Sequence, residues 1–287
     1  MEKTQKRIVD ILVLSDIHLG TYGCHAKELL HYLKSIKPQM VILNGDIIDI
    51  WQFSKSYWPK SHMKVVKHLL GLMSKDIPIY YIPGNHDEML RKFEGFHLGG
   101  LQIENKVIIT LPDGKKAWCF HGDVFDVTMQ HSKWLTKLGA VGYDILILIN
   151  RLVNFFSEKV FQRGKLSLSK KIKNSVKSAV KFINDFEQTA ADIAIDNGYD
   201  FVVCGHIHQP DIRTIQNNVG SVVYLNSGDW MENLSALEYV DGHWQLYKYE
   251  TDSIEPDETD DELQDSKALF DNMLAEFTSM KHKEAHQ

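Results

Sequence analysis

The sequence is poor in several features that would assign it to a specialised class of protein. Only three of its 287 residues are cysteines, and Cys24, Cys119 and Cys204 lie far apart. An odd number of distant cysteines, two of them in apolar runs, favours buried thiols in a reducing compartment over a disulfide framework. No apolar run is as long as a membrane span, and the amino-terminal MEKTQKRIVDILVL has too short an apolar run for a signal peptide. We therefore expect a cytoplasmic protein.

An excess of positive charge is also absent. The formal net charge is −6 at pH 7, from 32 Lys and Arg residues against 38 Asp and Glu residues. Surfaces that bind nucleic acid are usually basic, so we expect no nucleic-acid partner. Hydrophobic residues make up 44% of the chain and charged residues 24%, as in ordinary globular proteins, and the length allows one large domain or two small ones.

Apolar runs alternate with helical patterns in the first third of the chain. Strands are predicted at 8–14, 40–43 and 77–82, and helices at about 27–36 and 61–73. This alternation is typical of parallel strands joined by crossover helices. In such sheets the functional groups collect where strands end and loops begin.

The rest of the core is predicted to contain mostly antiparallel strands. Together with the first third, these strands indicate an α/β fold of two facing mixed sheets between helices, formed by residues 1–128 and 198–250. A Pro-Asp-Gly turn at 112–114 indicates a hairpin between two of the later strands. The later strands are expected at 101–103, 107–111, 116–120, 202–204, 211–216, 221–226, 235–240 and 244–249.

Residues 129–197 contain no strand pattern and are predicted to form a helical insertion. The part at 135–156 is unusually apolar, whereas the next part has eight basic residues from Lys159 to Lys181, opposed only by Glu158. Two interpretations stay open. The segment is either a buried helix beside a solvated one, or a cap over a site that contacts acyl chains, a membrane surface or a phosphorylated substrate.

The last segment, 251–287, is predicted to lie outside the core. The stretch 250–265 holds nine acidic residues and no basic one, and it contains Pro256. Such a composition is typical of a disordered, solvated segment. Residues 263–280 have the pattern of a short amphipathic helix.

Side chains that bind metals follow five of the predicted strands. Two carboxylates, one amide and four imidazoles are too many for one ion, but they suit two divalent ions that share a bridging carboxylate. A mixed nitrogen and oxygen set without thiolate disfavours a cysteine-type zinc site; we expect Mn²⁺, with Fe or Zn²⁺ as alternatives. Singly, each residue also fits a helix cap or a turn, but together they indicate one site. The residues are Asp16, His18, Asp46, Asn85, His121, His206 and His208.

These residues lie in motifs by which the sequence resembles the calcineurin-like metallophosphoesterase superfamily. The resemblance covers about residues 8–249 and implies a four-layer α/β/β/α sandwich with a dinuclear metal site at one edge of the two sheets. The motifs are DIH at 16–18, GDIID at 45–49, GNHD at 84–87, HGD at 121–123 and GHIH at 205–208. The resemblance implies that the first ion is held by Asp16, His18 and His208, that the second is held by Asn85, His121 and His206, and that Asp46 bridges them.

Two further residues receive catalytic roles from the same resemblance. His86 would stabilise or protonate the leaving oxygen, and Asp49 would orient the His86 ring and fix its tautomer. From the sequence alone, Asp49 also suits a helix N-cap after the strand. The implied reaction is hydrolysis of a phosphate ester or anhydride by hydroxide, which two bound ions make available near neutral pH.

Within the superfamily the chain is most similar to the branch of UDP-2,3-diacylglucosamine pyrophosphatases of lipid A synthesis. The similarity lies in the HGD motif, in GHIHQP at 205–210, in YLNSGDW at 224–230 and in the helical insertion. In that branch the inserted helices receive acyl chains. The resemblance thus implies a lipid-linked nucleotide substrate and peripheral contact of the insertion with the inner face of the membrane.

Other functions stay open at this point. The characterised pyrophosphatases usually carry arginine where this chain has His86. A phosphodiesterase or phosphomonoesterase that acts on a soluble substrate is therefore an alternative. So is a protein that binds a membrane surface through its basic insertion. A non-catalytic member of the superfamily is disfavoured because every motif is intact, and the sequence does not indicate an oligomeric state.

Overall fold

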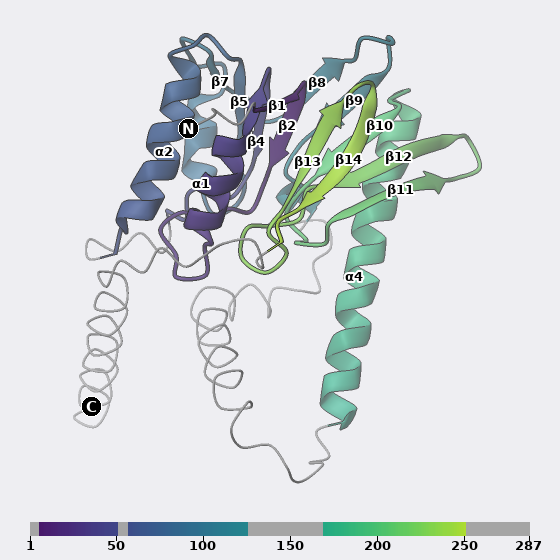
Figure 1. Ribbon diagram of the computed structural model, residues 1–287. Helices are drawn as coiled ribbons and strands as arrows, with labels where there is room; N and C mark the ends of the chain where they lie inside the picture. Colours follow the sequence, from purple (N-terminus) through teal and green to yellow (C-terminus); the bar gives the residue numbers. More distant parts are fainter. Residues whose placement is uncertain (1–5, 51–56, 126–168, 251–287) are drawn as a thin grey trace, which may run out of the picture. The chain divides into compact units, whose positions relative to one another are not determined.

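The structure of the chain is a computed structural model that describes residues 6–50, 57–125 and 169–250, with side chains in the last range described from residue 181 onward (Figure 1). Contacts divide the chain into one compact unit, Met1–Tyr249, and a second, Glu250–Gln287. Apart from Glu250 itself, the second unit is not described. The predicted apolar helix at 135–156, the acidic segment and the amphipathic helix at 263–280 thus lie outside the described residues.

The larger sheet brings together strands from both halves of the first unit. Strands β2, β4, β5 and β7 are parallel, whereas β13, β14 and β6 run antiparallel to their neighbours. The sheet is mixed, as the sequence predicts. Its seven strands lie in the order β14 (His243–Lys248), β13 (Ser235–Val240), β2 (Ile11–Leu14), β4 (Val41–Asn44), β5 (Ile79–Ile82), β7 (Leu101–Ile103) and β6 (His97–Leu98).

The smaller sheet is also mixed. Its central strand is parallel to both neighbours, and the pair at each edge is antiparallel. Its five strands lie in the order β11 (Asp211–Gln216), β12 (Ser221–Asn226), β10 (Phe201–Cys204), β9 (Lys116–Cys119) and β8 (Val107–Thr110).

The single strand predicted at 8–14 is wrong in one respect, because the chain bends at Asp10. The part before the bend, β1 (Arg7–Val9), pairs in parallel with β3 (Ile36–Pro38), while the part after it joins the larger sheet. Ile36 accordingly belongs to a strand and not to the end of the predicted helix. Local patterns of apolar residues do not reveal which strand a run will pair with.

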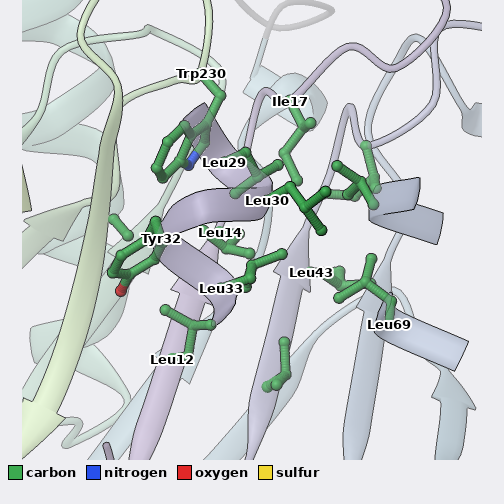
Figure 2. Packing of buried hydrophobic residues seen from close by; sticks show 14 of the residues in the cluster. Leu12, Leu14, Ile17, Leu29, Leu30, Tyr32, Leu33, Leu43, Leu69 and Trp230 are labelled. Carbon is green, nitrogen blue, oxygen red and sulfur yellow. The ribbon is translucent and has the colours of Figure 1, made fainter. Parts of the chain in front are cut away.

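Two helices cover the outer face of the larger sheet. They are α1 (Ala26–Ser35) and α2 (Lys60–Met73). Leu29 and Leu33 of α1 pack with Leu12 and Leu14 of β2 in one buried cluster, and Leu69 of α2 belongs to the same cluster. Figure 2 shows α1 lying over β2 with these leucines between them. The spacing of the leucines along α1 places them on a single face of the helix.

Successive residues of a strand point to opposite faces of the sheet and therefore pack in different layers of the core. In β2, Leu12 and Leu14 face α1, whereas Ile11 and Val13 point to the opposite side and pack in the cluster between the two sheets. Val203 of β10 reaches that same cluster from the smaller sheet. Since successive strand residues point to opposite faces, each central strand contributes to two layers of the core.

The fourth layer is the helix α4 (Ser169–Asp196), which lies beside β10 and β12 (Figure 1). Phe186, Ala190 and Ala194 pack with Val202 and Tyr224 on the outer face of the smaller sheet. Part of the segment predicted as an insertion therefore covers the core. Together with short 3₁₀ helices at Glu88–Phe93 (η1) and Asp123–Phe125 (η2), these elements form the predicted four-layer α/β/β/α sandwich.

None of the helices in the described ranges combines the length and the apolar character that a bilayer-spanning segment needs.

Candidate metal centre

The predicted metal ligands follow strands whose carboxyl ends lie at one edge of the fold. In the larger sheet, β2, β4 and β5 are adjacent and parallel; in the smaller sheet, β9 and β10 are adjacent and parallel. Parallel neighbours end at the same edge of a sheet, so the loops that follow them meet. The ligands in these loops are Asp16 and His18 after β2, Asp46 after β4, Asn85 after β5, His121 after β9, and His206 and His208 after β10.

A first group consists of Asp16, His18 and His208. One ligand atom of each residue lies within 4.8 Å of the other two. The Nε2 atom of His208 is 3.2 Å from Oδ1 of Asp16, and the ring centroids of His18 and His208 are 5.5 Å apart. These three side chains are close enough to hold one ion.

A second group consists of Asp46, His121 and His206, whose ligand atoms also lie within 4.8 Å of one another. Nε2 of His121 is 3.4 Å from Oδ2 of Asp46, and the ring centroids of His121 and His206 are 5.2 Å apart. Asn85 is half-buried in the loop beside them. The backbone N–H of the next residue, His86, donates to Oδ1 of Asp46 at 2.8 Å.

Asp46 lies between the two groups. The same oxygen, Oδ2, is 3.4 Å from Nε2 of His121 and 3.9 Å from Nε2 of His18. One carboxylate thus faces an imidazole of each group, and Oδ1 is held in place by the His86 backbone. A carboxylate in this position suits a bridge between two ions.

Three buried polar atoms in the centre test whether metal ions fit it. Oδ1 of Asp16, Nε2 of His18 and Nε2 of His121 make no well-formed hydrogen bond among the described residues. Each has instead an ion-pair partner, 3.2 to 3.9 Å away. Buried polar atoms are nearly always satisfied, because an unsatisfied one costs about 1–3 kcal/mol. All three are metal-ligating atoms, and coordination to cations would satisfy them. The donor set fits divalent ions.

Hydrogen bonds to the other ring nitrogen set the tautomers of two of these histidines. Nδ1 of His121 lies 2.8 Å from the backbone oxygen of Asn44, so Nδ1 carries the hydrogen and donates it. Nδ1 of His18 lies 3.4 Å from Oδ2 of Asp49. In both rings Nε2 keeps the lone pair that a metal needs, which is the usual arrangement around metal-binding histidines.

Asp49 contacts a second imidazole, that of His86, which forms a third group with His18 and Asp46 because their ligand atoms also lie within 4.8 Å of one another. Its Oδ2 lies 2.8 Å from Nδ1 of His86, and the His86 side chain is 26% exposed whereas Asp49 is buried. The rings of His18 and His86 are nearly perpendicular, with centroids 4.7 Å apart. The alternative role of Asp49 as a helix cap has no support in the described residues, where the next helix is α2 and begins at Lys60.

The backbone of the centre is strained. Asp16, His18, Asp46, His206 and His208 all have positive φ angles, between 51° and 69°. Left-handed backbone costs residues other than glycine roughly 1 kcal/mol each and is concentrated at functional sites. Aspartate and histidine adopt this conformation more often than most residues, but their positions in the motifs do not by themselves predict it.

Glycines in the motifs let the loops approach one another. Gly45 has a φ of 86°, and a Cβ atom there would lie 2.8 Å from Cβ of His121 and still closer to its ring. A Cβ on Gly84 would lie 2.7 Å from Nε2 of His121. Any larger residue at either position would push His121 away from Asp46.

Ion pairing shifts the pKa values of the clustered groups in opposite directions. Burial raises the pKa of Asp16, but the charge and hydrogen bond of His208 outweigh it and lower the pKa to about 2. Burial lowers the pKa values of the imidazoles, yet Asp16 raises that of His208 to about 9 and Asp46 raises that of His121 to about 10. Without metal, the carboxylates are charged and pair with protonated histidines.

Asp87, for which the sequence patterns predict no role, accepts hydrogen bonds from two of the loops that carry candidate ligands. Its carboxylate accepts hydrogen bonds from the backbone N–H of Gly84 at 2.6 Å, from that of Ile47 at 2.9 Å and from the Tyr81 hydroxyl at 2.6 Å. The loop with Asp46 and the loop with Asn85 are therefore fixed to the same buried side chain. The last position of the GNHD motif is the signal that could have revealed it.

Asp229 supports the loop of His208 in a similar way. Its Oδ1 accepts from the backbone N–H of Met231 at 2.7 Å, and its Oδ2 lies 3.9 Å from Nδ1 of His208. Asn233 donates both to Asp229 and to the backbone oxygen of His208. The YLNSGDW motif contains this aspartate but does not reveal its position.

Residues 9–210 match the model of the calcineurin-like phosphoesterase family. The chain belongs to this family. It is therefore a metal-dependent hydrolase, as the sequence predicts.

Similar proteins agree with this family. The UDP-2,3-diacylglucosamine hydrolase of Blochmanniella pennsylvanica (strain BPEN) is 26% identical over 80% of this chain and 92% of its own length. That of Aliivibrio fischeri (strain MJ11) is 25% identical over 84% of this chain and 98% of its own length. Among solved structures, a dimetal phosphatase from Danio rerio is 10% identical and covers 85% of this chain and 96% of its own, with a TM-score of 0.38. The last likeness is too low to bear on function.

Proposed function

We propose that the chain hydrolyses the pyrophosphate bond of UDP-2,3-diacylglucosamine with two divalent ions at the strand-end site. The position of Asp46, with one oxygen facing both ligand groups, is the observation on which the dinuclear reaction rests. The substrate is supported by the names of relatives that match this chain over more than nine-tenths of their length.

We assign the ligands as the two groups of side chains suggest. Asp46 bridges the ions, and Mn²⁺ is the metal we expect, with Fe or Zn²⁺ as alternatives. When bound, two divalent ions supply positive charge for the phosphoryl oxygens and acidify a water nucleophile. The first ion would be held by Asp16, His18 and His208 and the second by His121 and His206. Asn85, in the loop after β5, would complete the second set.

His86 protonates the leaving oxygen in this proposal. Burial lowers its pKa, but the hydrogen bond and charge of Asp49, together with the charge of Asp46, raise the pKa above its ordinary value. With Nδ1 bonded to Asp49, Nε2 is the atom available to the substrate. The proton moves from Nε2 to the oxygen of the departing phosphate, and Asp49 keeps the ring in the orientation that this transfer needs.

A second candidate is hydrolysis of a soluble phosphodiester or phosphomonoester. It is favoured by His86, because the characterised pyrophosphatases usually carry arginine at this position of the motif. Cytoplasmic location and peripheral contact of residues 129–197 with the inner face of the membrane belong to the first proposal. The part of that segment before residue 169 lies outside the described residues.

Values of kcat/KM measured with Mn²⁺ on a panel of substrates distinguish the two candidate functions. We expect kcat/KM for UDP-2,3-diacylglucosamine to exceed those for cyclic nucleotides, simple phosphodiesters and phosphomonoesters by at least about a hundredfold, which corresponds to about 2.7 kcal/mol of transition-state binding. Cleavage of the soluble esters alone would exclude the lipid substrate. The variant Asp46→Asn serves as the control for a contaminating phosphatase.

A further inference from the structure

A basic groove lies between α1 and α2, away from the metal centre. It encloses about 460 Å³ and is lined by Lys34, Lys64, Lys67, Lys75, His68 and Gly71. Figure 1 shows the two helices side by side. Lys34 is in the last turn of α1 and Lys75 follows α2. Crossover helices run opposite to the parallel strands they connect, so these lysines lie toward the sheet edge opposite the metal ligands.

The positive charge of the groove is not neutralised by neighbouring side chains. No carboxylate is among the described residues that line it. Among the residues that the structure describes, none of the four lysines forms an ion pair, although the chain as a whole has a net charge of −6. Like charges gathered at one place repel one another and cost stability. A bound anion would remove that cost.

His68 reports the potential inside the groove. Its ring is half-buried in the wall of the groove. Burial lowers its pKa, and the charges of Lys6, Lys34 and Lys75 lower it further. These lysines belong to three parts of the chain: the segment before β1, the last turn of α1 and the segment that follows α2. The imidazole is therefore a natural probe for any anion that enters.

The floor of the groove has room for a compact ligand. Buried Leu30 and Leu72 form its apolar part. Gly71 is an interior residue of α2, and a Cβ atom on it would meet nothing within 4 Å. Lysine ammonium groups around a small open space bind phosphate as point charges. We propose that this groove binds a phosphate group and forms a second anion site, independent of the metal centre and of the substrate proposed above.

Two substitutions at Gly71 distinguish the effect of added negative charge from the effect of added side-chain volume. Gly71→Glu brings a carboxylate into the groove, whereas Gly71→Gln has nearly the same shape without the charge. Neither clashes with the protein at Cβ. Both also replace a glycine within α2 by a better helix former, so the fold should survive.

The pKa of His68, measured by NMR on the metal-loaded full chain, tests the site. We expect inorganic phosphate to raise this pKa by about one unit or more, as a nearby opposite charge does. Gly71→Glu should raise it without ligand and abolish the response to phosphate, while Gly71→Gln keeps the response. Lys34→Gln combined with Lys75→Gln should weaken the response about tenfold or more, a loss of about 1.4 kcal/mol in binding free energy. Lys106→Gln, an exposed lysine elsewhere, should leave it unchanged.

A second arm distinguishes a free phosphate from a lipid headgroup. The chain is sedimented with phosphatidylcholine vesicles that contain phosphatidylglycerol. Co-sedimentation that Gly71→Glu removes and Gly71→Gln preserves would identify the lipid headgroup as the source, whereas a His68 response to inorganic phosphate alone identifies a soluble ligand. The groove proposal is overturned if inorganic phosphate does not change the pKa of His68 and the vesicles do not bind the chain. It is also overturned if Asp46→Asn removes all phosphate binding while Gly71→Glu removes none. Neither outcome affects the proposal for the metal centre.

Discussion

At the scale of single residues, the assignment of Asp46 as the bridge has a direct consequence. Asp46→Asn removes one negative charge from the position between the two groups but keeps an oxygen for the His86 N–H. We expect it to lose at least one metal ion and to lower turnover about a thousandfold or more. Elemental analysis and kcat measure the two effects, with circular dichroism as the control for folding. Full metal-dependent activity in this variant would show that the site is not dinuclear.

His86→Ala separates catalysis from metal binding. A ligand atom of His86 lies close to those of His18 and Asp46, but the resemblance assigns His86 to neither ion. We therefore expect the metal content to equal that of the native chain, with Asp49 left without its contact to His86. Loss of a general acid lowers turnover about 10²- to 10⁴-fold. His206→Ala is the matched control and should lose metal and activity together. Loss of metal from His86→Ala would instead make His86 a ligand.

Metal binding should release protons at neutral pH. In the metal-free chain the pKa of His208 is about 9 and that of His121 about 10, so both rings are protonated at pH 7.5. Ions bind neutral imidazole, and binding therefore displaces about two protons and strengthens as pH rises toward these pKa values. Above about pH 10 the release should vanish. Calorimetry in buffers of different ionisation enthalpy counts the protons, and no release at pH 7.5 would contradict the ion pairs described here.

At the scale of elements, α4 supports the HGD loop and His206 through the side chain of Phe186. Phe186 is fully buried, contacts the ring of Phe125 and lies with its ring centroid 6.2 Å from that of His206. A Cβ on Gly122 would be 2.7 Å from its Cε2 atom, so the HGD loop rests on this ring. The helix thus positions ligands that lie on other elements.

Phe186→Ala should accordingly be costly. We expect a loss of about 3–5 kcal/mol in the free energy of unfolding, because a buried ring is replaced by a cavity. Urea denaturation measures it, and the exposed Phe96 supplies the control variant Phe96→Ala, which should change stability by less than about 0.5 kcal/mol. Equal effects of the two substitutions would mean that α4 does not pack as described.

At the scale of the whole molecule, the metal centre joins the two sheets. Its ligands follow three strands of the larger sheet and two of the smaller one. Ions held by ligands from both sheets would bind the folded chain more tightly than the unfolded chain, in which these ligands are far apart. At concentrations of about 100 to 1,000 times Kd, they should stabilise the folded chain by about 3–4 kcal/mol.

Removal of metal with a chelator should lower Tm by several degrees, and added Mn²⁺ should restore it. Differential scanning calorimetry measures the shift. Asp46→Asn provides the control, because its Tm should respond less to chelator. A native Tm that is indifferent to metal would show that the ions do not link the sheets.

The fold class and the identity of the candidate ligands can both be predicted from the sequence alone. Alternating strand and helix patterns imply parallel strands. The candidate ligands can be recognised in the sequence because polar residues such as Asp16 and His121 closely follow apolar runs. The bend at Asp10 and the pairing of Ile36 escaped prediction, since they depend on which distant strand each segment meets.

The resemblance already implies how the ligands are grouped, whereas the way in which they are held in place depends on the tertiary structure. The positive φ angles of residues such as His206, the tautomer of His121 and the support of Asp87 and Asp229 arise from contacts between loops far apart in the chain. The same holds for the basic groove, whose lysines come from two helices. The sequence gives the order of side chains along the chain. The distances between side chains that are far apart in sequence depend on the long-range packing that holds the loops in place.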